Sequence, residues 1–526
     1  MTVLVFWGLI LAFCISFALL KWSDIKYRRK GLPRGTMGWP LFGETLDFLK
    51  YGPDFMKKQS AKYGSVFKSH ILGCPTVISM DQELNRYILM NEGKGLVPGY
   101  PQSMLDVVGK TNIAAVHGSA HKFIRGSLLS LVGTAAIKDQ LFPDIDKFIR
   151  ILTNNWDGKT IDIQEKAIEM AFYVAFRQII SAECDLIYEA FKREFDKVAT
   201  AALSLPINIP GTSYYQGLQA RKNIHKILRQ IMEERKASRK THNDMFAELI
   251  GNENSRYRLT EEQMFDQIFT ILYSGYETVS ITTMMAVKYL HDHPKALQEL
   301  REEHLAIRER KKPDEPIDWN DYKSMSFTRA VILETSRLAT IVNGLLRKTT
   351  QDVELNGFLI PKGWRIYVFT RELNYDPVLY PEPYTFNPWR WLDKSLESHS
   401  YCFLFGAGSR LCPGKELGMV KVATFLHYFV TKYRFGSVFK THILGCPTVI
   451  SLNQELNRYF LMNEGKGLVP GYPKSMLDVM GKTNIAAVHG SAHKFIRGSL
   501  LTLIGPEAIR DQLHEKFYQQ LGWQNH

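Results

Sequence analysis

The stretch "FLFGAGSRLCPGKELG" at residues 403–418 places Cys412 between a glycine-rich turn and a predicted helix. Pro413 follows the cysteine, and proline is favoured in the first turn of a helix. Backbone N–H groups and the positive end of the helix would then face the cysteine, and both stabilise a thiolate. The stretch therefore predicts that Cys412 is held as a thiolate that is available as a ligand.

The residues around this cysteine fit a flat, anionic partner. Glycines let the backbone approach such a partner closely, and a guanidinium beside them can pair with an anion. A thiolate in this setting suits axial ligation of haem iron, with the guanidinium on a haem propionate. A buried, inert cysteine is the alternative. The cofactor-binding residues follow the Phe-x-x-Gly-x-Arg-x-Cys-x-Gly spacing: Phe405, Gly408, Arg410, Cys412 as the metal ligand, and Gly414.

With this spacing the chain resembles the cytochrome P450 superfamily, which implies one haem b. In "ETSR", Glu334 and Arg337 are three residues apart on a predicted helix and can meet. "FNPWRW" supplies Arg390. The resemblance implies that these three residues form a buried ion-pair cluster in the haem-side core, whereas a surface helix pair is the local alternative.

A long helix is predicted from Thr260 to about Asp292, because "TEEQ" has the form of a capping box and Pro294 follows. Its centre is apolar nearly all round, which is typical of a helix buried through a large domain. The strand-like runs "SVFKSHIL", "PTVISM", "VELNGFLI" and "WRIYVFT" are short. We therefore expect a mainly α fold with small β-sheets, as in a cytochrome P450.

The motif "SGYETVS" lies midway along this helix. Gly275 relaxes the helix where a ligand comes close, and Glu277 and Thr278 put a carboxylate and a hydroxyl at one level. The resemblance implies catalytic roles: Thr278 orients a proton source during oxygen activation, and Glu277 feeds the proton relay. A threonine bonded back to a carbonyl of its own helix is the alternative.

Residues that pair with the haem propionates should be basic and should lie close to one another. "HGSAHKFIR" offers His121 and Arg125 four residues apart, and "LLRKTTQD" offers Arg347. The superfamily often has tryptophan at the position of His121, but histidine is still a donor. A solvated or core-satisfied histidine is the alternative for His121.

The motifs "YSGYETVS", "RELNYDP", "FNPWRWLDKSLE" and "CPGKELG" most resemble plant brassinosteroid-6-oxidases. The resemblance implies oxidation of C-6 in 6-deoxo steroids such as 6-deoxocastasterone, with O2, to the alcohol, the ketone and in some members the lactone. It also implies electrons from NADPH through a membrane-bound NADPH–cytochrome P450 reductase. The apolar pocket candidates are Val107, Val108, Phe269, Tyr273, Ile341 and Val342.

Residues 3–20 are uncharged and almost wholly apolar, long enough for a single-pass anchor, although a buried core helix is the alternative. Basic residues follow at 21–30, so the catalytic domain is expected in the cytosol, at the endoplasmic reticulum membrane. The net charge of +13 is scattered along the chain, which argues against nucleic acid and favours a membrane surface or an acidic partner. The six cysteines form no CxxC pair, which argues against a disulfide framework or a zinc site.

Residues 64–141 recur at 436–513, with 67 of 78 positions identical. The predicted domains are an anchor with its basic flank at 1–30, a P450 domain lacking its C-terminal strand segment at 31–434, and the duplicate with an unrelated tail at 435–526. A fusion or mis-joined model of two neighbouring genes is one interpretation. Alternatively, an expressed copy competes for the place of the first copy, as in domain swapping, or exposes apolar surface. A catalytically impaired or inactive relative is accordingly the alternative function.

Overall fold

The computed structural model describes most of residues 27–433 and only short stretches beyond them. Outside the description are residues 1–26, 28, 40–42, 155, 157–160, 182–184, 203, 239–241, 243, 252–257, 434–437, 444–445, 452–457, 460–461, 463–487, 489 and 505–526. The predicted anchor at 3–20 therefore lies outside the described residues. In the described part of the chain, no helix has the length and apolar character needed to cross a bilayer.

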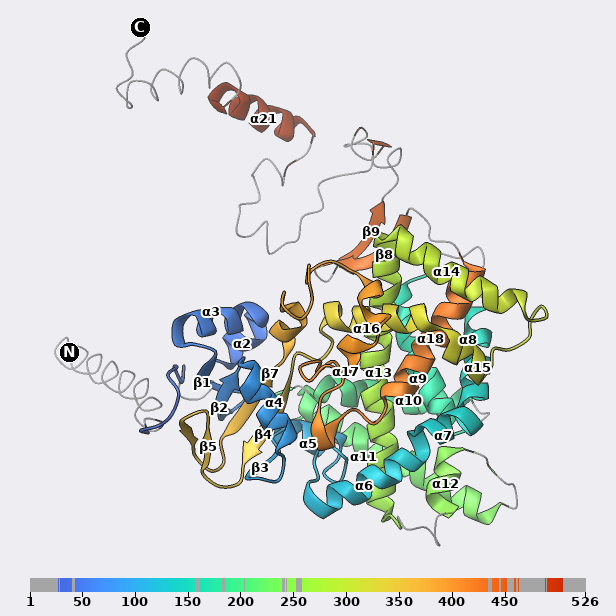
Figure 1. The fold of residues 1–526 in the computed structure, drawn as a ribbon, viewed down its shortest axis with the longest axis horizontal. Coiled ribbons are helices and arrows are strands. Elements are labelled where there is room, and N and C mark those ends of the chain that lie inside the picture. The colour runs from blue at the N-terminus through green and yellow to red at the C-terminus, as the bar shows by residue number, and fades with distance from the viewer. Residues whose placement is uncertain are drawn as a thin grey trace, which may run out of the picture. The chain divides into compact units, whose positions relative to one another are not determined.

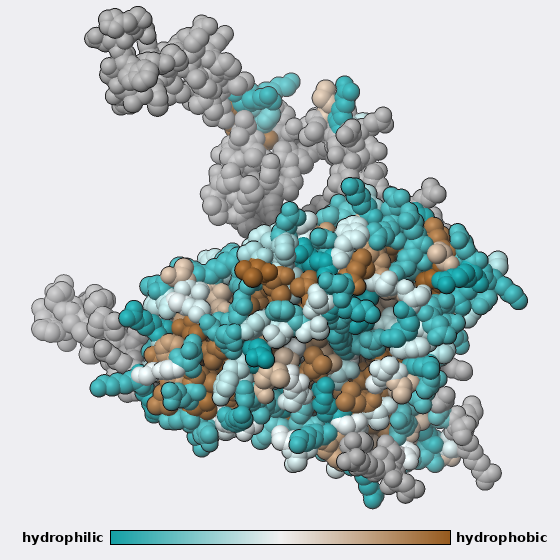
Figure 2. Space-filling view, viewed as in Figure 1, coloured by the Kyte–Doolittle hydropathy of each residue, from teal (hydrophilic) through white to brown (hydrophobic). Residues whose placement is uncertain are grey.

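The chain divides into two compact units, and the first comprises Met1–Asn155 and Gln164–Tyr433. This unit is mainly helical, with a small sheet at one side (Figure 1). Its visible face is largely hydrophilic, with separate hydrophobic patches (Figure 2). Its α-helices are α2 (Thr45–Tyr51), α3 (Pro53–Tyr63), α4 (Gln82–Met90), α5 (Gln102–Val108), α6 (Gly118–Val132), α7 (Thr134–Ala136), α8 (Phe142–Thr153), α9 (Ile163–Ile179), α10 (Asp185–Ala201), α11 (Ser213–Ala237), α12 (Met245–Gly251), α13 (Glu261–Asp292), α14 (Pro294–Glu309), α15 (Trp319–Ser324), α16 (Ser326–Ala339), α17 (Ser395–Ser398) and α18 (Lys415–Lys432). Short π and 3-10 turns are η1 (Ile137–Leu141), η3 (Arg371–Tyr375), η4 (Pro388–Trp391) and η5 (Gly408–Arg410).

The main sheet has the strand order β1-β2-β7-β4-β3. Its strands are β1 (Val66–Ile71), β2 (Cys74–Ser79), β3 (Leu96–Pro98), β4 (Gly344–Thr349) and β7 (Arg365–Phe369), and β5 (Val353–Leu355) and β6 (Phe358–Ile360) form a separate hairpin. Neighbouring side chains of β2 enter different clusters, Val77 with Ile88 of α4 and Ile78 with Phe55 of α3, because a strand alternates its faces. The four predicted strand runs are confirmed, whereas β3 and β4 were not predicted.

The long helix α13 runs through the helical body (Figure 1). The Thr260 hydroxyl accepts from the Gln263 amide at 3.3 Å, and the Gln263 side chain accepts from the Thr260 amide at 2.9 Å. This is the predicted capping box, and the helix ends at Asp292 as predicted. The mainly α fold with small sheets is thus confirmed.

The ion-pair cluster predicted in the haem-side core is present. Glu334 and Arg337 on α16 are fully buried, and Arg337 donates from Nε and Nη2 to the two carboxylate oxygens, both at 2.8 Å. Arg390 Nε lies 3.3 Å from Glu334 Oε1, and the indole of Trp391 donates to Oε2 at 2.8 Å. The alternative of a surface pair is therefore wrong.

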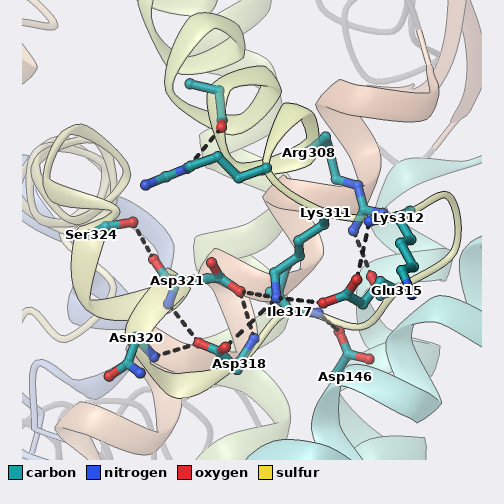
Figure 3. A network of polar contacts seen from close by, with 12 residues as sticks. Asp146, Arg308, Lys311, Lys312, Glu315, Ile317, Asp318, Asn320, Asp321 and Ser324 are labelled. Carbon is teal, nitrogen blue, oxygen red and sulfur yellow. Dashed lines mark hydrogen bonds and ion pairs between the residues drawn. The ribbon is translucent and has the colours of Figure 1, made fainter.

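A polar network joins the connection between α14 and α15 to Asp146 of α8 (Figure 3). Lys311 Nζ lies 2.8 Å from Asp321 Oδ2 of α15. The Ile317 amide donates to Asp146 of α8 at 3.3 Å, and the Tyr428 hydroxyl of α18 donates to the same carboxylate. The network therefore ties α18 to α8 and to the α14–α15 turn.

The second unit carries the duplicated sequence. Strands β8 (Val438–Ile443) and β9 (Cys446–Ser451) pair in the register of β1 and β2, 372 positions earlier. Helix α21 (Gly490–Ile504) has the extent of α6. In these three described stretches the copy forms the same local elements as the first segment, and its origin stays a prediction.

Candidate functional site

The loop before α18 presents Cys412 with an exposed side chain. The Cys412 amide donates to the Phe405 carbonyl at 2.9 Å, which closes the loop. The Lys415 ammonium lies 5.0 Å from the centre of the Phe405 ring. Gly414 caps α18, so the helix begins three residues after the cysteine and Pro413 precedes the cap.

The sequence predicts that the surroundings of Cys412 stabilise its thiolate, whereas in the structure their net effect is the opposite. Displacement of bulk water by the surrounding protein raises the pKa of the Cys412 thiol. The backbone N–H groups of Gly414 and Lys415 and the charges of Arg125 and Lys415 lower it, but less strongly. The expected donors are present, whereas the net stabilisation of a thiolate by the protein alone is not. A coordinated metal cation deprotonates a thiol outright, so ligation does not require a low pKa beforehand.

Different structural constraints act on the glycines of the cysteine loop and on Gly275 of α13. Gly408 has φ +64°, and an added Cβ would lie 2.6 Å from the carbonyl oxygen of Leu89 on α4. Close packing against α4 is by itself a reason for glycine at position 408, and its place beside a flat cofactor stays a prediction. An added Cβ at Gly414, or at Gly275 on α13, meets no atom within 4 Å, so both positions leave room beside the backbone.

Arg410, the expected propionate partner, already has a protein partner that sequence reasoning missed. Its Nε lies 2.9 and 2.7 Å from the two carboxylate oxygens of Glu92. The guanidinium also donates to the carbonyl oxygens of Ile113, at 2.5 Å, and Val116, at 2.6 Å. Burial works to raise the pKa of Glu92, but Arg410 and the neighbouring Arg347 lower it overall, so the carboxylate is ionised.

Arg347 on β4 and His121 on α6 carry buried nitrogen atoms without hydrogen-bond partners. Arg347 is 2% exposed, and its Nη2 lies 3.9 Å from Glu92 Oε2, beyond hydrogen-bond reach. Arg347 Nε and Nη2 and His121 Nε2 have no hydrogen-bond partner in the described structure. Burial, reinforced by the charge of Arg410, lowers the pKa of His121 to about 4, so the ring is neutral near pH 7. One carboxylate therefore faces two guanidinium groups and several unpaired donors.

Arg125 occupies a different place from the other basic residues. It donates from Nη2 to the carbonyl oxygen of Leu411 at 2.8 Å, and its charge acts on Cys412. The structure thus gathers Arg410, Arg347 and His121 around Glu92, while it directs Arg125 to the backbone of the cysteine loop.

The three residues predicted to be catalytic lie on one partly exposed turn of α13. Glu277 is exposed and Gly275 and Thr278 are partly exposed, although Leu272 and Val279 on either side are buried. The Thr278 hydroxyl donates to the Ser274 carbonyl at 2.7 Å, which is the back-bonded geometry given above as the alternative. Helices α13 and α18 are in contact, so this turn and the Cys412 loop belong to neighbouring elements.

The apolar pocket candidates separate into two groups. Val107, Val108 and Phe269 are at most 5% exposed and belong to side-chain packing. Tyr273 and Ile341 are partly exposed, and Val342 is 48% exposed. Exposure therefore favours the second group as residues able to touch a ligand.

These features fit a haem. An exposed thiol can act as axial ligand, and room beside Gly275 and Gly414 suits a flat ring. The buried N–H groups of Arg347 that have no hydrogen-bond partner call for acceptors with negative charge, which propionates supply.

The comparisons with known proteins agree with this geometry. A family model described as cytochrome P450 matches residues 33–497. Cytochrome P450 85A1 of Solanum lycopersicum is 63% identical over 448 residues, which are 85% of this chain and 96% of the relative. The 3-epi-6-deoxocathasterone 23-monooxygenase CYP90D1 of Arabidopsis thaliana is 36% identical over 434 residues, 80% of this chain and 88% of that protein.

Among solved structures, retinoic acid-bound cyanobacterial CYP120A1 matches with a TM-score of 0.70. The match covers 81% of this chain and all of that chain, at 24% sequence identity. At this identity the likeness supports the fold alone.

Proposed function

This chain belongs to the cytochrome P450 family, and from that premise we propose that it oxidises C-6 of 6-deoxo brassinosteroids of the 6-deoxocastasterone type. The observation that carries the proposal is the 63% identity to cytochrome P450 85A1 over 96% of that relative. The motif resemblance to plant brassinosteroid-6-oxidases supplies the substrate class. The name of CYP90D1, which refers to a 6-deoxo steroid, supports a steroid substrate for the wider group.

Haem b would be held by the Cys412 thiolate, with Arg347 and His121 directed to the propionates. Arg410 would add its charge while it stays paired with Glu92, and Arg125 would keep the cysteine loop in place. When bound, the haem supplies activation of O2 for insertion of oxygen at a C–H bond. The Lys415 ammonium over the Phe405 ring stiffens the loop on the side of α18.

The chain's own contribution to proton supply comes from the exposed turn of α13. The Thr278 hydroxyl donates to the Ser274 carbonyl, so its lone pairs remain free to accept from water. Glu277 is exposed next to it and can exchange protons with solvent. Gly275 leaves space beside the helix for the reacting group. We assign Thr278 to orienting the proton source and Glu277 to replenishing it.

The proposed partners are an NADPH–cytochrome P450 reductase, the steroid and O2. The net charge of +13 favours an acidic electron donor and a membrane surface over a neutral partner. Anchoring through residues 3–20 would place the enzyme at the endoplasmic reticulum with its catalytic domain in the cytosol. Trp39, Leu46 and Leu49, at and before α2, are 61–68% exposed, which supports contact of this side with lipid.

The second candidate is an impaired P450, and the copied segment after Tyr433 favours it. Both are tested by incubating the 526-residue chain with reductase, NADPH and 6-deoxocastasterone. The proposed function predicts a 6-hydroxylated and then a 6-keto product that the Cys412→Ala variant does not form. Hydroxylation at another carbon would refute the assignment to C-6, and absence of both haem and product would favour the impaired relative.

A further inference from the structure

A buried carboxylate on α13 joins three parts of the first unit. Asp266 is fully buried and accepts at Oδ2 from the Thr111 amide, at 2.9 Å, and from the Thr111 hydroxyl, at 2.6 Å. At Oδ1 it accepts from Arg221 Nη2 of α11. Arg221 Nη1 in turn donates to the Val108 carbonyl at the end of α5, at 2.9 Å. We call Arg221, Asp266 and Thr111 the clamp.

The clamp holds one end of residues 109–116, which connect α5 to α6 and which we call the strap. Gly109 has φ +127°, and an added Cβ would lie 2.3 Å from Asp266 Oδ1, so the strap touches the carboxylate directly. Within the strap, the buried Asn112 side chain accepts from the Ala114 amide at 2.7 Å and the Ala115 amide at 3.0 Å. These bonds make the strap a defined turn rather than a loose loop.

The other end of the strap reaches the cysteine loop. The carbonyl oxygens of Ile113 and Val116 accept from Arg410, two residues before Cys412. The strap therefore connects the N-terminal part of α13 with the side chain that stands beside the proposed propionate site. Thr278 follows Asp266 by 12 residues on α13, roughly 18 Å along the helix. A steroid held near Thr278 and Cys412 would therefore lie toward the end of the strap that Arg410 holds, while Asp266 holds the other end.

We propose that Arg221, Asp266 and Thr111 are positioning residues, which hold the strap and thereby set both the shape of the steroid site and the orientation of Arg410. The identity of the substrate rests on the proposed function, whereas the mechanical role of the clamp does not. Replacing Asp266 by asparagine keeps the size of the side chain but removes the charge that balances Arg221, whose side chain is 12% exposed. The NH2 group of the asparagine would face donors, so the attachment of the strap to α13 would be weakened.

The same chain offers a matched control with the same chemistry and no strap. Asp244, 2% exposed, accepts from the Ser181 amide at 2.8 Å and the Ser181 hydroxyl at 2.6 Å. It also accepts from Arg235 Nη2, again on α11, at 2.7 Å. Asp244→Asn therefore breaks an equivalent buried Arg–Asp–hydroxyl cluster away from the strap.

The experiment compares the full-length holoprotein with its Asp266→Asn and Asp244→Asn variants. Hydrogen exchange of the amides of residues 109–116 is measured without steroid, and 6-deoxocastasterone is titrated by its change in the haem absorption spectrum. We expect Asp266→Asn to speed exchange in the strap at least tenfold and to weaken steroid binding at least tenfold, with the thiolate-type carbon-monoxide spectrum retained. Asp244→Asn should leave exchange in the strap and steroid affinity within twofold of wild type.

A milder pair of variants covers the case in which Asp266→Asn does not fold. Thr111→Val should loosen the strap and raise KM more than it lowers kcat, and Thr111→Ser, which keeps the hydroxyl, should restore both values. The proposal is overturned if strap exchange is unchanged in Asp266→Asn or Thr111→Val, or if Asp244→Asn changes it equally. A wild-type protein that does not bind the steroid would refute the proposed substrate, while strap exchange would still decide the role of the clamp.

Discussion

Replacing Glu334 by glutamine removes the one carboxylate that balances a fully buried arginine. Glu334 and Arg337 are both 0% exposed and joined by two hydrogen bonds of 2.8 Å. The Asn387 amide, at 2.9 Å, and the Trp391 indole, at 2.8 Å, donate to the same carboxylate. Glutamine has nearly the same shape, but its NH2 group turns a donor toward donors and leaves the arginine charge uncompensated.

The size of the effect follows from this burial. Breaking a buried ion pair by removing one partner costs about 3–5 kcal/mol. A folded domain has a total free energy of unfolding of about 5–15 kcal/mol. Glu334→Gln should therefore remove a large share of the stability. The cluster joins α16 to the segment around η4, so the loss should reach the haem-side core.

Equilibrium urea unfolding of the full chain, followed by tryptophan fluorescence, measures this loss. The matched control is Asp196→Asn, which breaks the 2.8 Å ion pair with Lys192 on α10, where the side chains are 44% and 28% exposed. The control should lose less than about 1 kcal/mol, because exposed pairs contribute little. The reasoning is refuted if Glu334→Gln loses no more than the control does.

Three further predictions concern oxygen use, the cysteine loop and pH. Thr278→Ala should retain haem but consume NADPH with a lower yield of oxidised steroid, since its hydroxyl would no longer orient the proton source; an unchanged product-to-NADPH ratio would contradict its role. Gly408→Ala forces a Cβ to within 2.6 Å of the Leu89 carbonyl at φ +64°, so haem content per protein should fall, and normal content would show that the loop tolerates the strain. Burial lowers the pKa of the His304 imidazole to about 3. Below about pH 6.5 this histidine takes up a proton in the unfolded state but not in the folded state, so stability is lost as the pH falls from about 6.5 to about 3. His304→Gln should flatten the slope of unfolding free energy against pH there by up to about 1.4 kcal/mol per unit, whereas replacement of the exposed His399 should not, and equal slopes would refute this account.

The features that were predicted correctly from the sequence are encoded locally. The capping box at Thr260 depends on a residue three positions away, and Glu334 and Arg337 lie on adjacent turns of one helix. Strands β1, β2 and β7 follow from short apolar runs. In these cases residues that are close in the chain are also close in space, whereas the burial of the Glu334–Arg337 pair and the addition of Arg390 were implied by the family resemblance.

The features that were missed depend on tertiary contacts. Glu92 is 318 residues from Arg410, and no local pattern marks an acidic residue before a glycine as the partner of a distant arginine. Asp266 and Thr111 are 155 residues apart and meet only because α13 passes the end of α5. The packing of Gly408 against α4 was not predicted, because α4 is distant from it in sequence. Contact partners of this kind emerge only when the whole chain is folded.

The carbon-monoxide difference spectrum of the reduced, full-length chain tests the central claim most directly. The claim is that Cys412 ligates a haem within a P450 fold that forms despite the copied segment after Tyr433. We predict a red-shifted Soret band of the thiolate-ligated type, absent from the Cys412→Ala variant. No band, or only the shorter-wavelength band of a haem without thiolate, would contradict it.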